Sequence, residues 1–118
     1  MAANDPKLKG ATGTGLVTVS DWNACYNNGD DVIALSCRVA TDDSSATISG
    51  VGLTLNNSEG RIIGSFYTQF SGGSKSVNPA INLPPNGLGV GDIVWGVVTG
   101  QVKGQHYFTE QKLTVSSC

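Results

Sequence analysis

The three cysteines are the residues of this chain whose chemistry depends most directly on their positions. They are Cys25, Cys37 and Cys118, and three pairings are possible, each leaving one thiol free. If the chain resides in a reducing compartment, all three are plain thiols. A disulfide needs Cα atoms within about 7 Å of each other. The choice between these alternatives therefore depends on which cysteines the fold brings together.

Few side chains in this sequence could support catalysis, because His106 is the only histidine. A serine or cysteine nucleophile would need this residue as its base, and a zinc site would need three or four converging ligands. The glycine-rich run of residues 87–91 leads into a predicted strand and not a helix, which is typical of a turn and not of a phosphate-binding loop. We therefore expect neither an enzyme nor a bound cofactor.

Four acidic residues in predicted turns are weak candidates for calcium ligands. They are Asp30, Asp31, Glu59 and Asp92, and calcium takes six to eight oxygen ligands from such loops. The regular Asp-x-Asp-x-Asp spacing of a dedicated calcium loop is missing. Because Asp and Asn are also the usual turn-forming residues, the pattern favours turn chemistry and predicts no metal site.

Aromatic residues are the remaining candidates for binding. Tyr67 follows Phe66, and Phe108 follows Tyr107. Neighbouring residues of a strand point to opposite faces, so one member of each pair is expected in the core and the other outside. The outer members are either scattered surface aromatics or part of an exposed patch. Tyr67 and Tyr107 as a coplanar pair, with Phe108 nearby, would suit a protein partner or a stacked sugar.

Strands are the elements that must position these side chains. Short runs of alternating apolar and polar residues, each ended by Gly, Asn, Asp or Pro, fill most of the chain. The expected strands cover residues 16–22, 32–39, 46–55, 61–67, 77–83, 93–102 and 106–115. A slip in the apolar phase predicts a β-bulge beside Gly50. Pro79 predicts an edge strand, and Trp95 is expected to be the bulky core residue of a central strand.

About seven strands at this spacing predict an all-β fold, an antiparallel immunoglobulin-like β-sandwich, with a small β-barrel as the alternative. We expect one domain over residues 15–118, preceded by an extended tail over residues 1–14. A true immunoglobulin domain bridges cysteines of its second and sixth strands. The sixth strand here has Trp95 and no cysteine, so no family's functional residues are carried over to this chain.

This topology favours one of the cysteine pairings, and it assigns each loop to one of the two ends, or poles, of the sandwich. The first and last strands of such a sandwich end at the same pole, which predicts a Cys25–Cys118 disulfide and a buried, free Cys37 thiol. The alternative Cys25–Cys37 bridge would close only the first hairpin. The loops with the four acidic candidates are expected at that pole. Residues 42–43 and His106 are expected at the opposite pole.

Composition excludes several kinds of partner. Charged residues make up 14% of the chain, the formal net charge is −2, and the seven Lys and Arg are scattered. We therefore expect no nucleic-acid partner. No stretch approaches the roughly 20 apolar residues of a membrane span, and residues 1–6 lack a signal-peptide pattern. The Gly-, Ser-, Thr- and Asn-rich composition favours an extracellular or cell-surface location, with a signal or anchor removed ahead of Met1.

The sequence thus indicates a scaffold more than a catalyst. The preferred function is a non-enzymatic structural or assembly module acting through protein–protein contacts, including self-assembly, such as a filament, fimbrial, adhesin or decoration-type subunit. Two alternatives are a carbohydrate-binding module and a secreted protease inhibitor.

Overall fold

The computed structural model describes residues 7–8, 17–41, 43–102 and 104–118. Every helix or strand assigned in these residues is a β-strand, which confirms the all-β prediction. The strands are β1 (Lys7–Leu8), β2 (Val17–Asn27), β3 (Val32–Thr41), β4 (Ile48–Asn57), β5 (Ile62–Ser74), β6 (Ser76–Val77), β7 (Ala80–Leu83), β8 (Ile93–Val102), β9 (Gln105–Thr114) and β10 (Ser116–Ser117).

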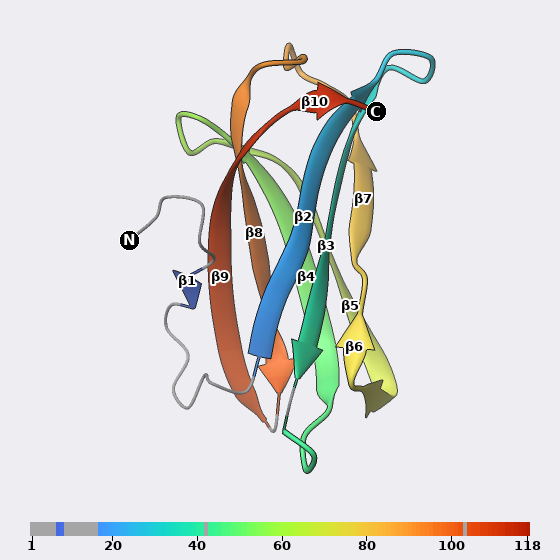
Figure 1. The fold of residues 1–118 in the computed structure, drawn as a ribbon, viewed down its shortest axis with the longest axis vertical. Coiled ribbons are helices and arrows are strands. Elements are labelled where there is room, and N and C mark those ends of the chain that lie inside the picture. The colour runs from blue at the N-terminus through green and yellow to red at the C-terminus, as the bar shows by residue number, and fades with distance from the viewer. Residues whose placement is uncertain (1–6, 9–16, 42, 103) are drawn as a thin grey trace.

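The strands form two sheets that pack face to face (Figure 1). Sheet A has the order β1-β9-β8-β4-β5, and sheet B has the order β10-β2-β3, with β6 and β7 on the other side of β3. All pairs are antiparallel except β10 with β2. The two sheets confirm the predicted immunoglobulin-like sandwich and rule out the alternative closed barrel. In an immunoglobulin constant domain the fourth strand lies in the sheet of the first, whereas here β5 pairs with β4 in sheet A.

The core lies between the sheets and takes alternate residues from each strand. On β3, Ile33, Leu35, Cys37 and Val39 are buried, as their alternation predicted. The facing residues come from β4 and β8 in the middle of sheet A. They are Ile48, Val51, Leu53, Leu55, Val94, Val98 and Val102. Burial of each such side chain contributes about 1.5–3 kcal/mol before the conformational entropy of ordering is set against it.

The register of the long strands shifts at three places, one of which lies between the Leu55–Gly64 and Asn56–Ile62 pairs and leaves Ile63 as an extra residue of β5. The β2–β3 pairing shifts between Ser20 and Asn23, where Asp21 adopts a positive φ of 56°. Because the ladder resumes after this bulge, β2 runs on to Asn27, and Cys25 lies within the strand and not just past it as predicted. The expected bulge beside Gly50 is present: the pairing of β4 with both neighbours shifts between Ile48 and Gly50.

The predicted fifth strand is split in two. Ser76–Val77 (β6) and Ala80–Leu83 (β7) both pair with β3, and Asn78 and Pro79 lie between them. The carbonyl of Pro79 accepts a hydrogen bond from the Cys37 amide at 3.2 Å. Since proline has no N–H, it sits at an edge of sheet B, as predicted. The strand expected over residues 61–67 is longer than predicted, because β5 continues to Ser74.

The two tryptophans lie in different surroundings. Trp95 is only partly buried on the outer side of sheet A, because the inward positions of β8 belong to Val94, Gly96 and Val98. The prediction that Trp95 is a core residue is therefore wrong. Trp22 packs against the core instead, and its ring occupies the space that a side chain at Gly96 would fill.

The N-terminal segment contributes to sheet A where it is described. Lys7 and Leu8 pair antiparallel with Glu110 and Thr109 of β9. These two residues therefore form a short strand within the predicted tail of residues 1–14, and the rest of that tail lies outside the described residues. In the part of the chain that the structure describes, no helix is long and apolar enough to cross a membrane.

Candidate interaction surface

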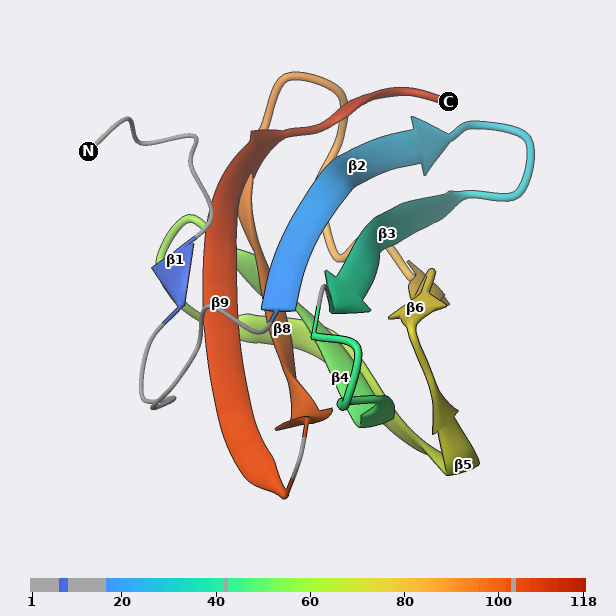
Figure 2. The same ribbon diagram turned by 60° about the horizontal axis from the view of Figure 1, so that its bottom comes forward.

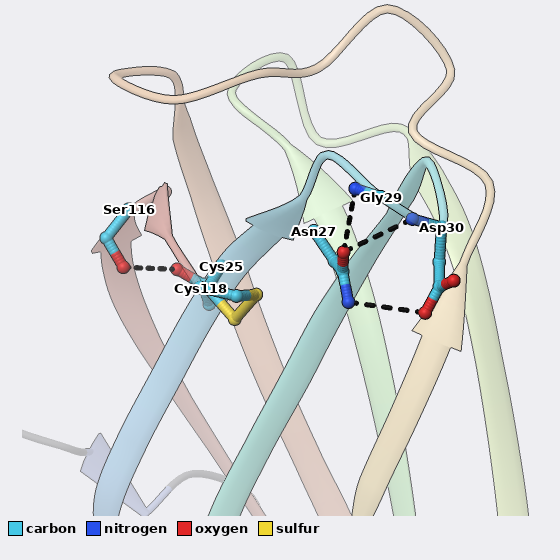
Figure 3. The surroundings of a disulfide bond; sticks show 7 residues. Cys25, Asn27, Gly29, Asp30, Ser116 and Cys118 are labelled. Atoms are coloured by element: carbon cyan, nitrogen blue, oxygen red, sulfur yellow. Dashed lines mark hydrogen bonds between the residues drawn. A yellow bond between two sulfur atoms is a disulfide. The ribbon is translucent and has the colours of Figure 1, made fainter.

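The Cys25–Cys118 disulfide ties the C-terminus to β2 of sheet B (Figure 3). The sulfur atoms are 2.01 Å apart and the Cα atoms 4.9 Å apart, so the structure has the pairing that the sequence predicted. After β9 in sheet A, the chain crosses to sheet B and pairs as β10 with β2. The Ser116 hydroxyl donates to the Ala24 carbonyl at 3.3 Å, and the Cys118 amide donates to the Tyr26 carbonyl at 3.1 Å. The disulfide therefore fixes the C-terminal segment in which the chain passes from sheet A to sheet B.

The β2–β3, β4–β5 and β7–β8 connections, which contain the acidic candidates for calcium, lie towards the same end of the sandwich, as predicted (Figure 1). Asp30 accepts a hydrogen bond from the Asn27 amide group at 3.3 Å (Figure 3), and Asp92 accepts one from the Gly89 amide at 2.8 Å. Asp31 accepts one from the Tyr26 hydroxyl at 2.7 Å, a bond that raises the pKa of Tyr26. These carboxylates act locally in turns.

The four candidates do not come together. Among the described residues no three His, Cys, Asp or Glu side chains converge as metal ligands. Glu59 lies in the β4–β5 turn, where its amide donates to Asn57 Oδ1 at 2.9 Å. The described residues therefore give no geometry on which to propose a calcium site.

Cys37 is buried in the core, whereas His106 is exposed at the surface. Cys37 has a free thiol and is 3% exposed, and burial raises its pKa to about 12. A thiol in such surroundings is a poor nucleophile. His106 is exposed near the start of β9, and this strand begins at the end of the sandwich opposite the C-terminus (Figure 1). Its Nε2 lies 3.4 Å from the side-chain nitrogen of Gln101.

The predicted pair of Tyr67 and Tyr107 does not form, because the two rings lie on opposite faces of sheet A. Tyr107 pairs with Gly100, points inward and is 3% exposed. Burial is the main cause that raises its pKa. Tyr67 is 50% exposed. Tyr107 is therefore a core residue and is not available to bind a ligand on the surface.

The other two aromatic candidates share the outer face of sheet A. Registers place Phe108 beside Thr99, Thr99 beside Gly52, and Gly52 beside Tyr67. The Tyr67 ring leans over the β4 glycines, since a Cβ added at Gly52 would stand 3.0 Å from its Cδ2 atom. We call this surface, with Tyr67, Phe108 and Trp95, the outer aromatic face. Trp95 was not among the predicted binding candidates. The sequence does contain a signal for it, because the polar residues Thr99 and Gln101 share its side of β8.

The edges of the two sheets differ in how they are protected against pairing. The β9 edge is covered in part by β1 and carries Glu110 and Lys112. The β2 edge is bulged at Asp21 and covered at its end by β10. The edge formed by β6 and β7 is interrupted at Pro79. Charges, bulges, proline and short covering strands are the devices by which natural proteins prevent edge-to-edge pairing.

β5 has one of these protections, the register shifts in its pairing with β4 at Ile63 and after Gln69, and lacks the others. Its 13 residues, Ile62–Ser74, contain neither a charged residue nor a proline. In the described part of the chain it pairs on one side only, with β4, and it lies at the limit of sheet A in both views (Figures 1 and 2). Ile62 and Tyr67, exposed by 64% and 50%, are two of the three exposed large apolar residues. We call the unpaired side of residues 62–69 the β5 edge.

A groove runs beside the β5 edge, where the two sheets separate. It is lined by Val51, Phe66, Thr68, Val77, Pro79 and Ala80. Phe66 is partly buried and packs against the core from this side. Further along, the Leu83 side chain fills the space above Gly64 and closes the gap between the sheets. The β5 edge therefore offers free backbone groups next to an open, partly apolar groove.

Comparisons with known proteins identify the fold and no family. No family model matches the chain, and no curated protein matches it. A DUF3823 family protein from Bacteroides ovatus is similar in structure, with 13% identity, a TM-score of 0.56, and coverage of 86% of this chain and 55% of that one. Wild-type OgpA from Akkermansia muciniphila has 16% identity, a TM-score of 0.53, and coverage of 83% and 27%.

The chain spans about half of the first of these proteins and about a quarter of the second. At such identities the likeness concerns the β-sandwich alone. Any function must be argued from the surfaces of this chain.

Proposed function

We propose that this chain is a non-enzymatic, surface-exposed structural module that assembles with other protein through an edge of its sheet. The observation that carries the proposal is the β5 edge, a long uncharged strand paired on one side only. An exposed edge is a template onto which a further strand adds through main-chain hydrogen bonds. A monomer that worked alone would be expected to protect this strand as it protects its other edges.

The disulfide supports an oxidising compartment for this module, since such bonds persist mainly outside the cytosol. Cys25 and Cys118 are bridged, while Cys37 is buried and shielded from oxidation. The location that we propose is extracellular, at a cell or particle surface. The low charge content of 14% suits packing among many neighbouring subunits better than steering toward a charged ligand.

The proposal is tested on native material, by fractionating the protein by size as it is found in its source. We expect it in particles larger than one chain, and we expect Ser65→Lys, an exposed change on β5, to release it as a smaller species. Ser58→Lys, in the exposed β4–β5 turn, is the matched control and should stay in the particles. Native protein that runs as a single chain at all concentrations would contradict the proposal.

Carbohydrate binding is a second candidate, which the outer aromatic face favours. Trp95, Phe108 and Tyr67 lie on one side of sheet A, and aromatic rings are the usual platforms for stacking apolar ligand faces. The polar residue Thr99 lies between Phe108 and Tyr67, and Gln101 follows two residues later on the same side of β8.

Retention on immobilised polysaccharides tests this candidate. If it is correct, Trp95→Ala and Tyr67→Ala each weaken retention, whereas Tyr107→Phe, a change inside the core, leaves it unchanged. Equal retention of all three variants and the unmodified protein, or no retention on any polysaccharide, would argue against it.

A further inference from the structure

We infer that the partner of the β5 edge is the β5 edge of a second copy of this chain, paired antiparallel about a two-fold axis. This inference rests on the proposed assembly function and names the partner for it. Such a contact would join two copies of sheet A into one continuous sheet across the dimer. A two-fold interface uses the same surface on both subunits, so the surface must be complementary to itself.

The charge pattern of β5 meets this requirement. Like charges directly opposite each other destabilise paired strands, and residues 62–74 contain no charge. Lys75 follows the strand, but its ammonium group donates to the carbonyls of Asp43 at 2.8 Å and Ser44 at 3.0 Å. These hydrogen bonds hold the Lys75 ammonium group against the β3–β4 loop and away from the unpaired side of β5. Residues 64–69, between the two register shifts of β5, are uncharged and regularly paired, which holds for no other sheet edge of similar length in the described residues.

The faces of β5 restrict the register of the pairing. Residues directly opposite in an antiparallel pair point to the same face, so Phe66 of one copy must meet an inward-facing residue of the other. Gly64, Phe66 and Thr68 face inward, opposite Leu55, Leu53 and Val51 of β4. Pairing centred on Phe66 sets it against its own copy, and it sets Gly64 against Thr68 of the second copy.

The groove beside β5 favours this centre. Phe66 lines the groove together with Val77 and Pro79, so two Phe66 rings at the axis would lie where the grooves of both copies meet. Aromatic pairs across strands contribute up to about 1 kcal/mol each. On the outer side, the same register sets Ser65 of one copy beside the exposed Tyr67 of the other. The contact therefore buries apolar groups on both faces of the joined sheet.

Sedimentation equilibrium of the purified full chain tests the inference. We expect the unmodified protein to dimerise reversibly. Ser65→Lys and Ser65→Glu should each raise the dimer Kd roughly fivefold or more, because like charges then lie diagonally across the axis, within reach of each other. An equimolar mixture of the two variants should recover dimers as Lys–Glu heterodimers. Ser58→Lys should dimerise as the unmodified chain does, and denaturant unfolding should show that all variants are folded.

A cysteine pair tests the register. Ser65→Cys and Tyr67→Cys should form a disulfide-linked dimer when the two variants are mixed, since the two positions face each other across the axis. Each variant alone should not cross-link, because identical positions are then two residues out of step, beyond the 7 Å or so that a disulfide spans. Efficient cross-linking of either variant alone, with no cross-linked heterodimer in the mixture, would overturn this register.

The outcomes separate the inference from the function on which it rests. A purified chain that stays monomeric, while native protein remains in large particles, would overturn self-pairing and leave assembly with a different partner. Monomers in both materials would overturn both. Dimers that the Ser65 charges do not weaken would also overturn the inference, because the contact would then lie elsewhere.

Discussion

The ring of Trp22, on β2 of sheet B, lies over Gly96, on β8 of sheet A. A Cβ added at Gly96 would stand 2.8 Å from Cε3 of the indole, closer than two such atoms approach in proteins. The absence of a side chain at Gly96 therefore makes room for the tryptophan between the sheets. This contact explains why a glycine occupies the middle of a central strand, where it otherwise weakens the sheet.

Gly96→Ala should lower the free energy of unfolding by about 1–3 kcal/mol, the usual cost of overpacking a filled core. Urea unfolding measures it. Gly89→Ala is the control, because a Cβ there meets nothing within 4 Å. In a double-mutant cycle with Trp22→Leu, the effect of Gly96→Ala should shrink, since the smaller side chain leaves space. Strict additivity would show that the two residues do not compete for this volume.

Loss of the disulfide should be the largest single change in stability. The double variant Cys25→Ser/Cys118→Ser removes a bridge between residues 93 positions apart, which the chain-entropy relation values at about 4–5 kcal/mol. Thermal or urea unfolding measures the loss. Reductant should lower the unmodified protein to the level of the variant and leave the variant unchanged. An unmodified protein that is insensitive to reductant would show that the bridge is not formed in solution.

Stability should fall as the pH rises from about 9 towards 12, because of Cys37. Burial raises the pKa of this thiol from 9.0 to about 12 in the folded state. The unfolded chain therefore loses the proton first, and ionisation favours unfolding in that window. At pH 10 the expected loss from Cys37 is about 1–2 kcal/mol. Tyr107, whose pKa burial also raises, acts in the same direction above pH 10.

Urea unfolding at pH 7 and pH 10, of the unmodified protein and of Cys37→Ala, isolates this contribution. The variant should lose less stability between the two pH values. Equal losses would mean that the Cys37 thiol ionises as easily in the folded protein as in the unfolded chain. Iodoacetamide should likewise leave Cys37 unmodified until the protein unfolds.

Tyr107→Phe should leave the free energy of unfolding unchanged or raise it by up to about 1 kcal/mol. The Tyr107 hydroxyl is buried and has no hydrogen-bond partner among the described residues, and removing an unsatisfied polar group relieves its desolvation. Tyr26→Phe is the control, because its hydroxyl donates to Asp31 at 2.7 Å and its loss should destabilise slightly. A clear loss of stability in Tyr107→Phe would reveal a partner such as a bound water.

Local pattern was sufficient for the strands and for one covalent link. The alternation of Ile33, Leu35, Cys37 and Val39 is a property of a single strand, because successive side chains of a strand point to opposite faces. The prediction of the Cys25–Cys118 bridge needed only the directions of the first and last strands. The length of β2 was underestimated because the bulge at Asp21 reverses the alternation, so that a continuous strand resembles two separate segments.

The candidate surface could be predicted only in part. Tyr67 and Phe108 were identified as candidates and lie on the outer face, while Tyr107 and Trp95 were assigned to the wrong sides of sheet A. Adjacent bulky residues in a strand leave two possible assignments, and each large side chain is an equally good core residue by type. The β5 edge could not be recognised at all, since a strand is an edge only with respect to its neighbours.

By itself the sequence determined that this chain is a β-sandwich closed by a disulfide, because alternation and turn residues act over a few positions. The tertiary structure alone decided which tryptophan enters the core, which tyrosine faces solvent, and which strand lacks a partner. Those outcomes depend on space shared between residues far apart in the chain, such as Trp22 with Gly96 and Tyr107 with Gly100. They also decide which surface is left for a partner, so the assembly contact that we propose follows from packing and not from any motif.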